Sequence, residues 1–531
     1  MAVAAVPVLD YYCSLPQQWQ VTVLLVVVPL VFLLVATRRR IRSWRRLRLP
    51  PGPPRLPILG NLHQLGALPH QSLRDLARRH GPAMLLRLGS VPTLVVSSSA
   101  AAREVMKAHD VDCCSRPDTP GARRLSYDHK DVAFAPYSEY WREMRKLFVV
   151  EFLSMRRVQA ASYAREAEVD KLVARLAAMD GEAVQLEDHA FGLMDGVIGT
   201  VAFGNIYGTE QFKHKKTFHE VLDEAMSAKA GFSAEDYYPN ALGRIVDRLT
   251  GAAARREKVF RDLDAFFDVI IDQHLDPSRP TPEHGPDLID AFVALMKERR
   301  HHLEGSSLRF TRDHIKGLLS NVFTASVDTS SVTMVWAMAE LIRRPAMMKK
   351  VQEEIRAAVG DKAERVHHDD MPKLRYLKMV VKETLRLHPA VPLLLPRETL
   401  RHVGICGYDV PAKTRVLVNA WAIGRDPAIW GNNTEVFEPE RFDGSDIDFN
   451  VTHFDLVPFG AGRRMCPGMA MGLATVTFTL ANLLYCFDWA LPEGMAPEDV
   501  DMEEAGGLTV HKKTPLLLVP TRYMHCQQQC P

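Results

Sequence analysis

The chain has 531 residues, of which 47% are hydrophobic and 24% charged, a globular composition that excludes collagen-like and intrinsically disordered chains. The formal net charge is +2, but seven arginines cluster between positions 38 and 48, and removing their charge leaves −5 for the remainder. A slightly acidic body argues against a nucleic-acid-binding protein.

The first feature along the chain is an apolar run from Val21 to Ala36, close to the ~20 residues that a membrane-spanning helix needs. Asp10 is the only charged residue before this run, and the arginine cluster follows it. A cleaved signal peptide, the alternative, carries its positive charge before the apolar stretch. Because arginine-rich flanks stay cytosolic, we expect an uncleaved single-pass anchor in the endoplasmic reticulum membrane, with the rest of the chain in the cytosol.

Five prolines follow between positions 50 and 57. Proline fixes φ and lacks an N–H group, so this stretch is not helical and is expected to form a stiff, extended linker. The predicted organisation is therefore a membrane anchor in residues 1–37, a basic stop and proline-rich linker in residues 38–62, and a catalytic domain in residues 63–531.

The rest of the chain has a mainly helical pattern with short strand-like segments. A long helix is predicted from Arg312 to Arg344, with Thr311 as its N-cap and Pro345 beyond its end. At 1.5 Å per residue it would extend ~50 Å, enough to cross a whole domain. The other clear segments are helices Lys373–Leu387 and Gly468–Tyr485, and strands Met84–Leu88, Thr93–Ser97, Arg415–Asn419 and Leu516–Val519.

A glycine-rich segment with one cysteine is the strongest chemical signal. Residues 458–468 read Pro-Phe-Gly-Ala-Gly-Arg-Arg-Met-Cys-Pro-Gly. The glycines allow a tight loop whose N–H groups can turn toward a thiolate, and the helix predicted after Pro467 favours an anion at its N-terminus. Cys466 is therefore a candidate iron ligand, the alternative being an isolated cysteine in a glycine-rich turn. No C-x-x-C pair occurs among the eight cysteines, which argues against a structural zinc site.

This pattern, F-x-x-G-x-R-x-C-x-G, resembles the haem-binding signature of the cytochrome P450 family, and the resemblance covers nearly all of the chain after residue 50. It implies a mainly α fold, a large helical domain with small β-sheets, and haem b (iron protoporphyrin IX) bound through the Cys466 thiolate. Phe459 and Gly468 are then expected to adjoin the haem, and Arg464 to hydrogen-bond a haem propionate.

Two other motifs resemble haem contacts of that family. Trp141 and Arg145, four residues apart on one helix face, resemble a pair that binds a propionate through the indole N–H and the guanidinium. The alternative for this pair is an ordinary helix edge with a salt bridge. Arg397, which follows Pro396, resembles a further propionate contact.

Glu383 and Arg386 resemble the E-x-x-R motif of the family. The spacing alone is not specific, since it also occurs elsewhere in this chain, for example at Glu340/Arg343, Glu353/Arg356 and Glu398/Arg401. The downstream Pro-Glu-Arg-Phe stretch, which contains Arg441, singles out the first pair, because the family places such an arginine against it in a buried structural triad. A buried triad needs all its members, since one left unpaired is costly.

The long helix contains a polar cluster, Ser326, Asp328 and Thr329, inside an otherwise apolar sequence. The resemblance implies that Asp328 and Thr329 form an acid–alcohol pair that guides protons to the oxygen site, and that Ser326 stands where the family usually has glycine. A serine there changes the space at that site and could hydrogen-bond a substrate. The alternative is a threonine bonded back to the preceding turn, with a surface aspartate.

The resemblance implies a monooxygenase that receives electrons from NADPH–cytochrome P450 reductase and acts on a small hydrophobic or aromatic substrate. It is closest to plant microsomal members that convert aromatic aldoximes to α-hydroxynitriles in specialised metabolism. By family position the substrate pocket draws on residues 116–134, 321–329, 390–395 and 506–509. The alternatives are a plant monooxygenase for another aromatic or terpenoid substrate, a haem-thiolate lyase or isomerase that needs no reductase, and a non-catalytic haem carrier; the acid–alcohol pair argues against the last two.

Overall fold

The computed structural model describes residues 47–204, 233–279, 284–301, 310–360, 364–449 and 452–523. The expected membrane anchor in residues 1–37 lies outside these residues. Within them, helix α22 (Met469–Cys486) is long and apolar enough to cross a membrane, but 67% of it is buried inside the protein. We therefore assign α22 to the core of the domain.

Helices make up most of the described chain, and the strands are short. The helices are α4 (Pro69–His80), α5 (Ser99–Arg103), α6 (Asp110–Cys113), α7 (Pro120–Leu125), α8 (Glu139–Phe148), α9 (Met155–Ala160), α10 (Ser162–Ala177), α11 (Leu186–Phe203), α13 (Ala234–Tyr237), α14 (Ala241–Leu249), α15 (Ala252–Leu275), α16 (Leu288–His301), α17 (Arg312–Ile342), α18 (Pro345–Val359), α19 (Arg375–Leu387), α20 (Ala420–Ile423), α21 (Pro427–Trp430) and α22. The strands are β1 (Ala83–Leu88), β2 (Val91–Val96), β3 (Val184–Gln185), β4 (Arg397–Glu398), β5 (Val403–Ile405), β6 (Tyr408–Val410), β7 (Arg415–Val418), β8 (Phe487–Ala490), β9 (Glu504–Ala505), β10 (His511–Lys512) and β11 (Leu517–Arg522).

The three helices predicted from the sequence are confirmed as α17, α19 and α22, with ends within two residues of those expected. Thr311 is the N-cap of α17, and its N–H donates to His314 Nδ1 at 3.1 Å. Pro345 takes the first position of α18, where its missing N–H costs no helical hydrogen bond. The four predicted strands are confirmed as β1, β2, β7 and β11.

The largest sheet has four strands in the order β1-β2-β7-β4, with β2 and β7 parallel and the other neighbours antiparallel. The proline-rich segment lies along β1. The Leu85 N–H donates to the Pro51 carbonyl at 2.8 Å, and the Asn61 N–H donates to the Arg87 carbonyl at 2.7 Å. The end of the proline-rich segment is therefore attached to this sheet.

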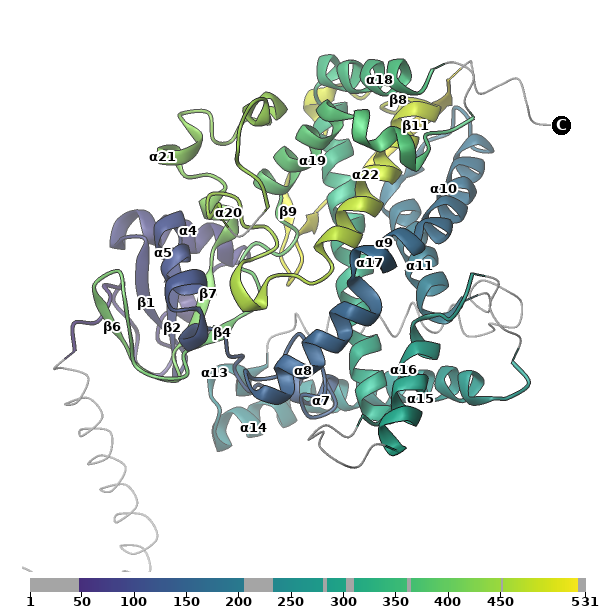
Figure 1. Cartoon of the computed structure of the whole chain (residues 1–531). Coiled ribbons are helices and arrows are strands. Elements are labelled where there is room, and N and C mark those ends of the chain that lie inside the picture. The colour runs from purple at the N-terminus through teal and green to yellow at the C-terminus, as the bar shows by residue number, and fades with distance from the viewer. Residues whose placement is uncertain are drawn as a thin grey trace, which may run out of the picture.

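Helix α17 forms the centre of the core. It is buried along nearly its whole length and packs against α11 on one side and α19 and α22 on others. Figure 1 shows α22, in yellow-green, passing close to α17, with the β1-β2-β7-β4 sheet at the opposite end of the molecule from α10 and α18. A helix buried all round has no solvent face, so every polar side chain on it needs a partner or a cavity.

Candidate active site

A tight loop before α22 presents the side chain of Cys466. The Cys466 N–H donates to the Phe459 carbonyl at 2.9 Å, and Gly460 and Gly462 have positive φ angles of 67° and 69°. A Cβ at Gly462 would come within 2.3 Å of a main-chain carbonyl oxygen, so glycine is required there. A Cβ at Gly468 would lie 4.0 Å from Cys466 Sγ, an ordinary van der Waals contact, so Gly468 lies directly beside the sulfur.

Cys466 lies deep in the protein, yet its side chain is exposed because it faces an internal cavity. The cavity has a volume of about 290 Å³ and mostly apolar walls. Burial raises the pKa of the Cys466 thiol, whereas the N–H groups of Gly468 and Met469 and the guanidinium of Arg145 lower it. Donors directed at a sulfur in this way stabilise a thiolate that binds a metal.

Four buried or half-buried arginines line the same cavity: Arg116, Arg145, Arg397 and Arg464. Arg397 pairs with the buried Asp110 at 3.0 Å, whereas the other three donate to main-chain carbonyl oxygens. Burial lowers the pKa of these three, that of Arg464 to about 9. Buried cations whose partners are neutral carbonyls favour an anionic ligand, so this wall fits the carboxylates of a haem.

Trp141 lies behind this wall and is not among the residues that line the cavity. Its indole N–H donates to the Val132 carbonyl at 2.9 Å, and the Arg464 guanidinium lies 3.9 Å from the centre of its ring. The Arg145 guanidinium lies 5.6 Å from the same ring. Trp141 therefore positions the two arginines, and its indole N–H, expected to bind a propionate, has a protein partner in this structure.

Ser326 and Thr329 face the cavity from α17, and Cys466 lies on another of its walls. The Thr329 hydroxyl donates to the Ala325 carbonyl at 2.6 Å, the back-bonding that the sequence left as an alternative. Over the ranges that the structure describes, the Ser326 hydroxyl makes no hydrogen bond to the protein. Ser326 is therefore a polar group in an apolar cavity that is free to bind a ligand.

Asp328 does not line the cavity. It is 7% exposed, so it is not the surface aspartate of the alternative interpretation. The Thr509 hydroxyl donates to one carboxylate oxygen, and His511 Nε2 lies 3.0 Å from the other. These two partners come from the segment that leads into β10 and from β10 itself, and Thr509 lines the cavity.

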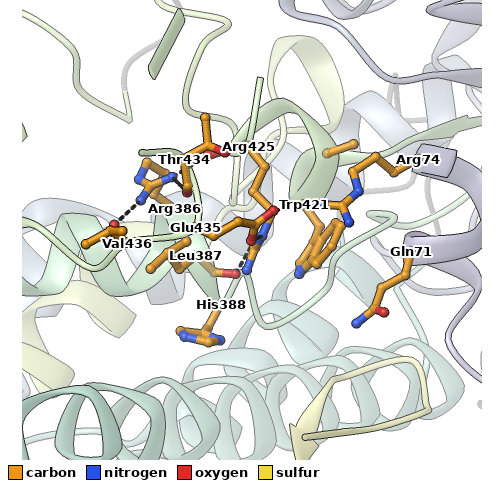
Figure 2. Close-up of polar contacts among 12 residues, drawn as sticks. Gln71, Arg74, Arg386, Leu387, His388, Trp421, Arg425, Thr434, Glu435 and Val436 are labelled. Atoms are coloured by element: carbon orange, nitrogen blue, oxygen red, sulfur yellow. Dashed lines mark hydrogen bonds and ion pairs between the residues drawn. The ribbon is translucent and has the colours of Figure 1, made fainter. Parts of the chain in front are cut away.

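The structure brings Glu383, Arg386 and Arg441 together, and none of the three lines the cavity. Arg386 donates to both carboxylate oxygens of Glu383 at 2.7 Å, and Arg441 Nε lies 3.4 Å from one of them. Both members of the first pair are buried. Arg386 also donates to the main-chain carbonyls of Gly424, Thr434 and Val436, of which the last two are visible in Figure 2.

A second cluster, also visible in Figure 2, connects this region to α4. The Trp421 ring lies between two guanidinium groups, 4.5 Å from that of Arg74 and 3.9 Å from that of Arg425. Glu435 accepts hydrogen bonds from both arginines, at 2.7 and 2.8 Å. Burial lowers the pKa of Arg425 to about 10, against the opposing effect of Glu435. This cluster fixes the end of α19, because Arg425 also donates to the Leu387 carbonyl.

Each of the four pocket ranges expected from the sequence contributes lining residues. Two roles were missed. Arg116 was expected only as part of a pocket range, but it is a buried cation beside the other arginines, and its neighbours Ser115 and Pro117 give no signal for that role. His511 has no local signal at all, because its partner Asp328 is 183 residues away.

The chain matches the family model described as "Cytochrome P450" over residues 50–519. It is 62% identical to 4-hydroxyphenylacetaldehyde oxime monooxygenase of Sorghum bicolor, covering 96% of this chain and 97% of that protein. It is 46% identical to 2-methylbutanal oxime monooxygenase of Manihot esculenta, covering 96% and 98%. A solved structure of a zebra fish cytochrome P450 with progesterone superposes with a TM-score of 0.72 at 25% identity, covering 85% of this chain and 99% of that one.

Proposed function

The chain belongs to the cytochrome P450 family and is a haem-thiolate monooxygenase, and from this premise we propose that it converts 4-hydroxyphenylacetaldehyde oxime into an α-hydroxynitrile in plant specialised metabolism. The substrate class comes from two relatives that are both named for oximes. The structural observation that carries the proposal is the free Ser326 hydroxyl in the cavity. A monooxygenase for another aromatic or terpenoid substrate is the alternative that the experiment below separates.

The residues around the cavity fit haem b. The Cys466 thiolate would bind the iron, with Phe459 and Gly468 beside it. The propionates would be bound by the arginine wall, namely Arg116, Arg145, Arg397 and Arg464, with Trp141 holding Arg464 in place. When bound, the haem iron supplies dioxygen activation with electrons from a redox partner, for which we propose NADPH–cytochrome P450 reductase.

The reaction has two stages that balance. In the first, the oxime loses water: its nitrogen loses the hydroxyl group, its carbon loses a hydrogen, and a nitrile results. In the second, one atom of dioxygen enters the carbon beside the nitrile, while two electrons and two protons reduce the other atom to water. The Ser326 hydroxyl would donate a hydrogen bond to the oxime oxygen, and Thr329 at this wall and Asp328 behind it would supply protons.

We also propose the membrane arrangement expected from the sequence. Residues 1–37 would anchor the chain in the endoplasmic reticulum membrane, residues 38–62 would form the basic stop and linker, and residues 63–531 would face the cytosol. The charge order around the apolar run supports this orientation.

The test supplies purified enzyme, reductase and NADPH with 4-hydroxyphenylacetaldehyde oxime. Release of cyanide and 4-hydroxybenzaldehyde in equal amounts, from breakdown of the hydroxynitrile, is the expected result. The absence of both a substrate-induced spectral shift and turnover, in a preparation whose haem is intact, would refute the oxime proposal and leave the monooxygenase assignment standing.

Two variants separate the hydroxyl of Ser326 from its size. Ser326→Ala removes only the hydroxyl, and Ser326→Gly restores the residue usual in the family. Loss of one hydrogen bond worth about 1 kcal/mol should weaken oxime binding roughly fivefold in both variants, and leave binding of the matching nitrile unchanged. If only Ser326→Gly altered oxime binding, space and not hydrogen bonding would be the role of this residue.

A further inference from the structure

Asp328, Thr509 and His511 form a closed cluster between the cavity and the surface. The Thr509 hydroxyl donates to Asp328 Oδ2, Asp328 Oδ1 lies 3.0 Å from His511 Nε2, and that nitrogen lies 3.2 Å from Thr509 Oγ1. The three groups are therefore in mutual hydrogen-bonding contact. Asp328 belongs to α17 and the other two to the start of the β10 region, so the cluster connects segments far apart in the sequence.

Exposure to solvent increases across the cluster, from Thr509 through Asp328 to His511. Thr509 is 6% exposed and lines the cavity, and the Asp328 side chain is 10% exposed and does not line it. The His511 side chain is 37% exposed and lies parallel to the Phe191 ring, with the ring centres 6.0 Å apart. The cluster thus extends from the cavity wall at Thr509 to solvent at His511.

We propose that His511 and Thr509 are positioning residues through which Asp328 exchanges protons, His511 with solvent and Thr509 with the cavity. The inference rests on the monooxygenase activity, which consumes two protons for each dioxygen, and not on which substrate is oxidised. Thr329 does not connect Asp328 to the cavity, since its hydroxyl donates to the Ala325 carbonyl.

The transfer moves one proton inward and no electrons. In the protonated His511 ring, the Nε2–H bond breaks as an O–H bond forms on Asp328 Oδ1, which leaves the ring neutral. The Thr509 hydroxyl, which donates to Asp328 Oδ2, turns its proton toward the cavity as a half-turn of the protonated carboxyl group brings the new proton to Thr509 Oγ1. Oγ1 takes up this proton while its former hydroxyl proton passes into the cavity. His511 then regains a proton from water. The imidazole suits this role because it gains and loses a proton near neutral pH.

The other charged groups around His511 have partners of their own. Lys512, next in the chain, donates to the Asp501 carbonyl, and Glu187 on α11 accepts the Leu516 N–H at 2.9 Å. Glu504 on β9, the strand paired with β10, lies 2.7 Å from His70 Nε2 and accepts from Gln71 at 2.7 Å. Of the carboxylates of Glu187, Glu504 and Asp328, that of Asp328 is the one in direct contact with His511.

The first experiment replaces the titrating ring. His511→Gln keeps a hydrogen-bond donor but cannot take up a proton, and His402→Gln is the matched control. His402 Nε2 also lies 3.0 Å from an aspartate, Asp409, on the β5–β6 hairpin, and neither of these residues lines the cavity. The substrate is 4-hydroxyphenylacetaldehyde oxime, and the assay measures the product formed, the hydrogen peroxide released and the NADPH consumed. Measurements run from about pH 6 to about pH 9 in steps of about half a pH unit, which covers the range where histidine titrates.

His511→Gln should lower product per NADPH on the order of tenfold, less than the full effect of a positioned acid–base group because water partly replaces it. Peroxide should rise in compensation, and the decline of coupling with rising pH that we expect of the wild type should be absent. Thr509→Val should behave alike, and Thr509→Ser should restore coupling. His402→Gln should match the wild type. Unchanged coupling and an unchanged pH profile in His511→Gln would overturn the inference, because a purely structural contact predicts that result.

A second measurement needs no turnover. Histidine labelled with ¹³C at the ring gives signals in the reduced, carbon-monoxide-bound holoenzyme, and the signal missing from His511→Gln identifies this residue. Its titration should move to lower pH in Asp328→Asn, because the carboxylate that favours the charged ring is gone. An identical titration in both proteins would show that the two groups are not coupled and would also overturn the inference. Failure of the oxime proposal alone would instead leave wild-type turnover absent and this titration shifted.

Discussion

Replacing Arg386 by alanine tests whether the buried charge triad holds the domain together. The change removes two hydrogen bonds to Glu383 and three to main-chain carbonyl oxygens. Glu383, which is 0% exposed, would keep, among the described residues, the Glu438 N–H at 2.8 Å and Arg441 at 3.4 Å. Breaking a buried pair costs about 3–5 kcal/mol, because an uncompensated charge is left inside. That is a large share of the ~5–15 kcal/mol by which a folded domain is stable.

The chain contains a matched control, because the tetrapeptide Glu-Thr-Leu-Arg occurs twice, at 383–386 and at 398–401. The Arg401 side chain is 73% exposed and pairs with Asp112, so Arg401→Ala should leave stability unchanged. Urea unfolding followed by tryptophan fluorescence gives the free energy, and the carbon-monoxide spectrum gives the fraction with intact haem–thiolate. A loss below ~1 kcal/mol in Arg386→Ala, no more than an exposed pair contributes, would refute the reasoning. Equal losses of stability in Arg386→Ala and Arg401→Ala would also refute it.

Two further predictions concern the iron site and electron entry. Cys466→Ser should abolish the long-wavelength carbon-monoxide band of the reduced protein, since that band requires a thiolate ligand, and a band that survives would exclude Cys466 as the ligand. Arg142 and Lys146 are exposed on α8, whose Arg145 donates to the carbonyl that precedes Cys466. Reversing both charges should slow reduction by the reductase at low salt without releasing haem, because complementary charges steer association. Stopped-flow reduction at the wild-type rate would mean that the reductase docks elsewhere.

The sequence predicts the parts of the fold whose signals are local. The cap at Thr311 and the proline after α17 define that helix, and the glycines around Cys466 define the loop, because each constraint acts within a few residues. The position of the arginine wall could not be derived in this way. Arg116, Arg397 and Arg464 converge from distant parts of the chain, and only the packed core brings their guanidinium groups to one cavity.

Asp328 shows why local patterns do not decide a role. The sequence leaves two interpretations of Asp328 and Thr329, an acid–alcohol pair or a back-bonded threonine with a surface aspartate, and the structure combines parts of both. Thr329 is back-bonded, yet Asp328 is buried, because Thr509 and His511 reach it from the segment around β10. A carboxylate beside an apolar cavity is costly unless it is hydrogen-bonded. These two partners therefore permit Asp328 to lie there. Replacing either one should alter proton exchange at Asp328, although the sequence motif that contains Asp328 stays the same.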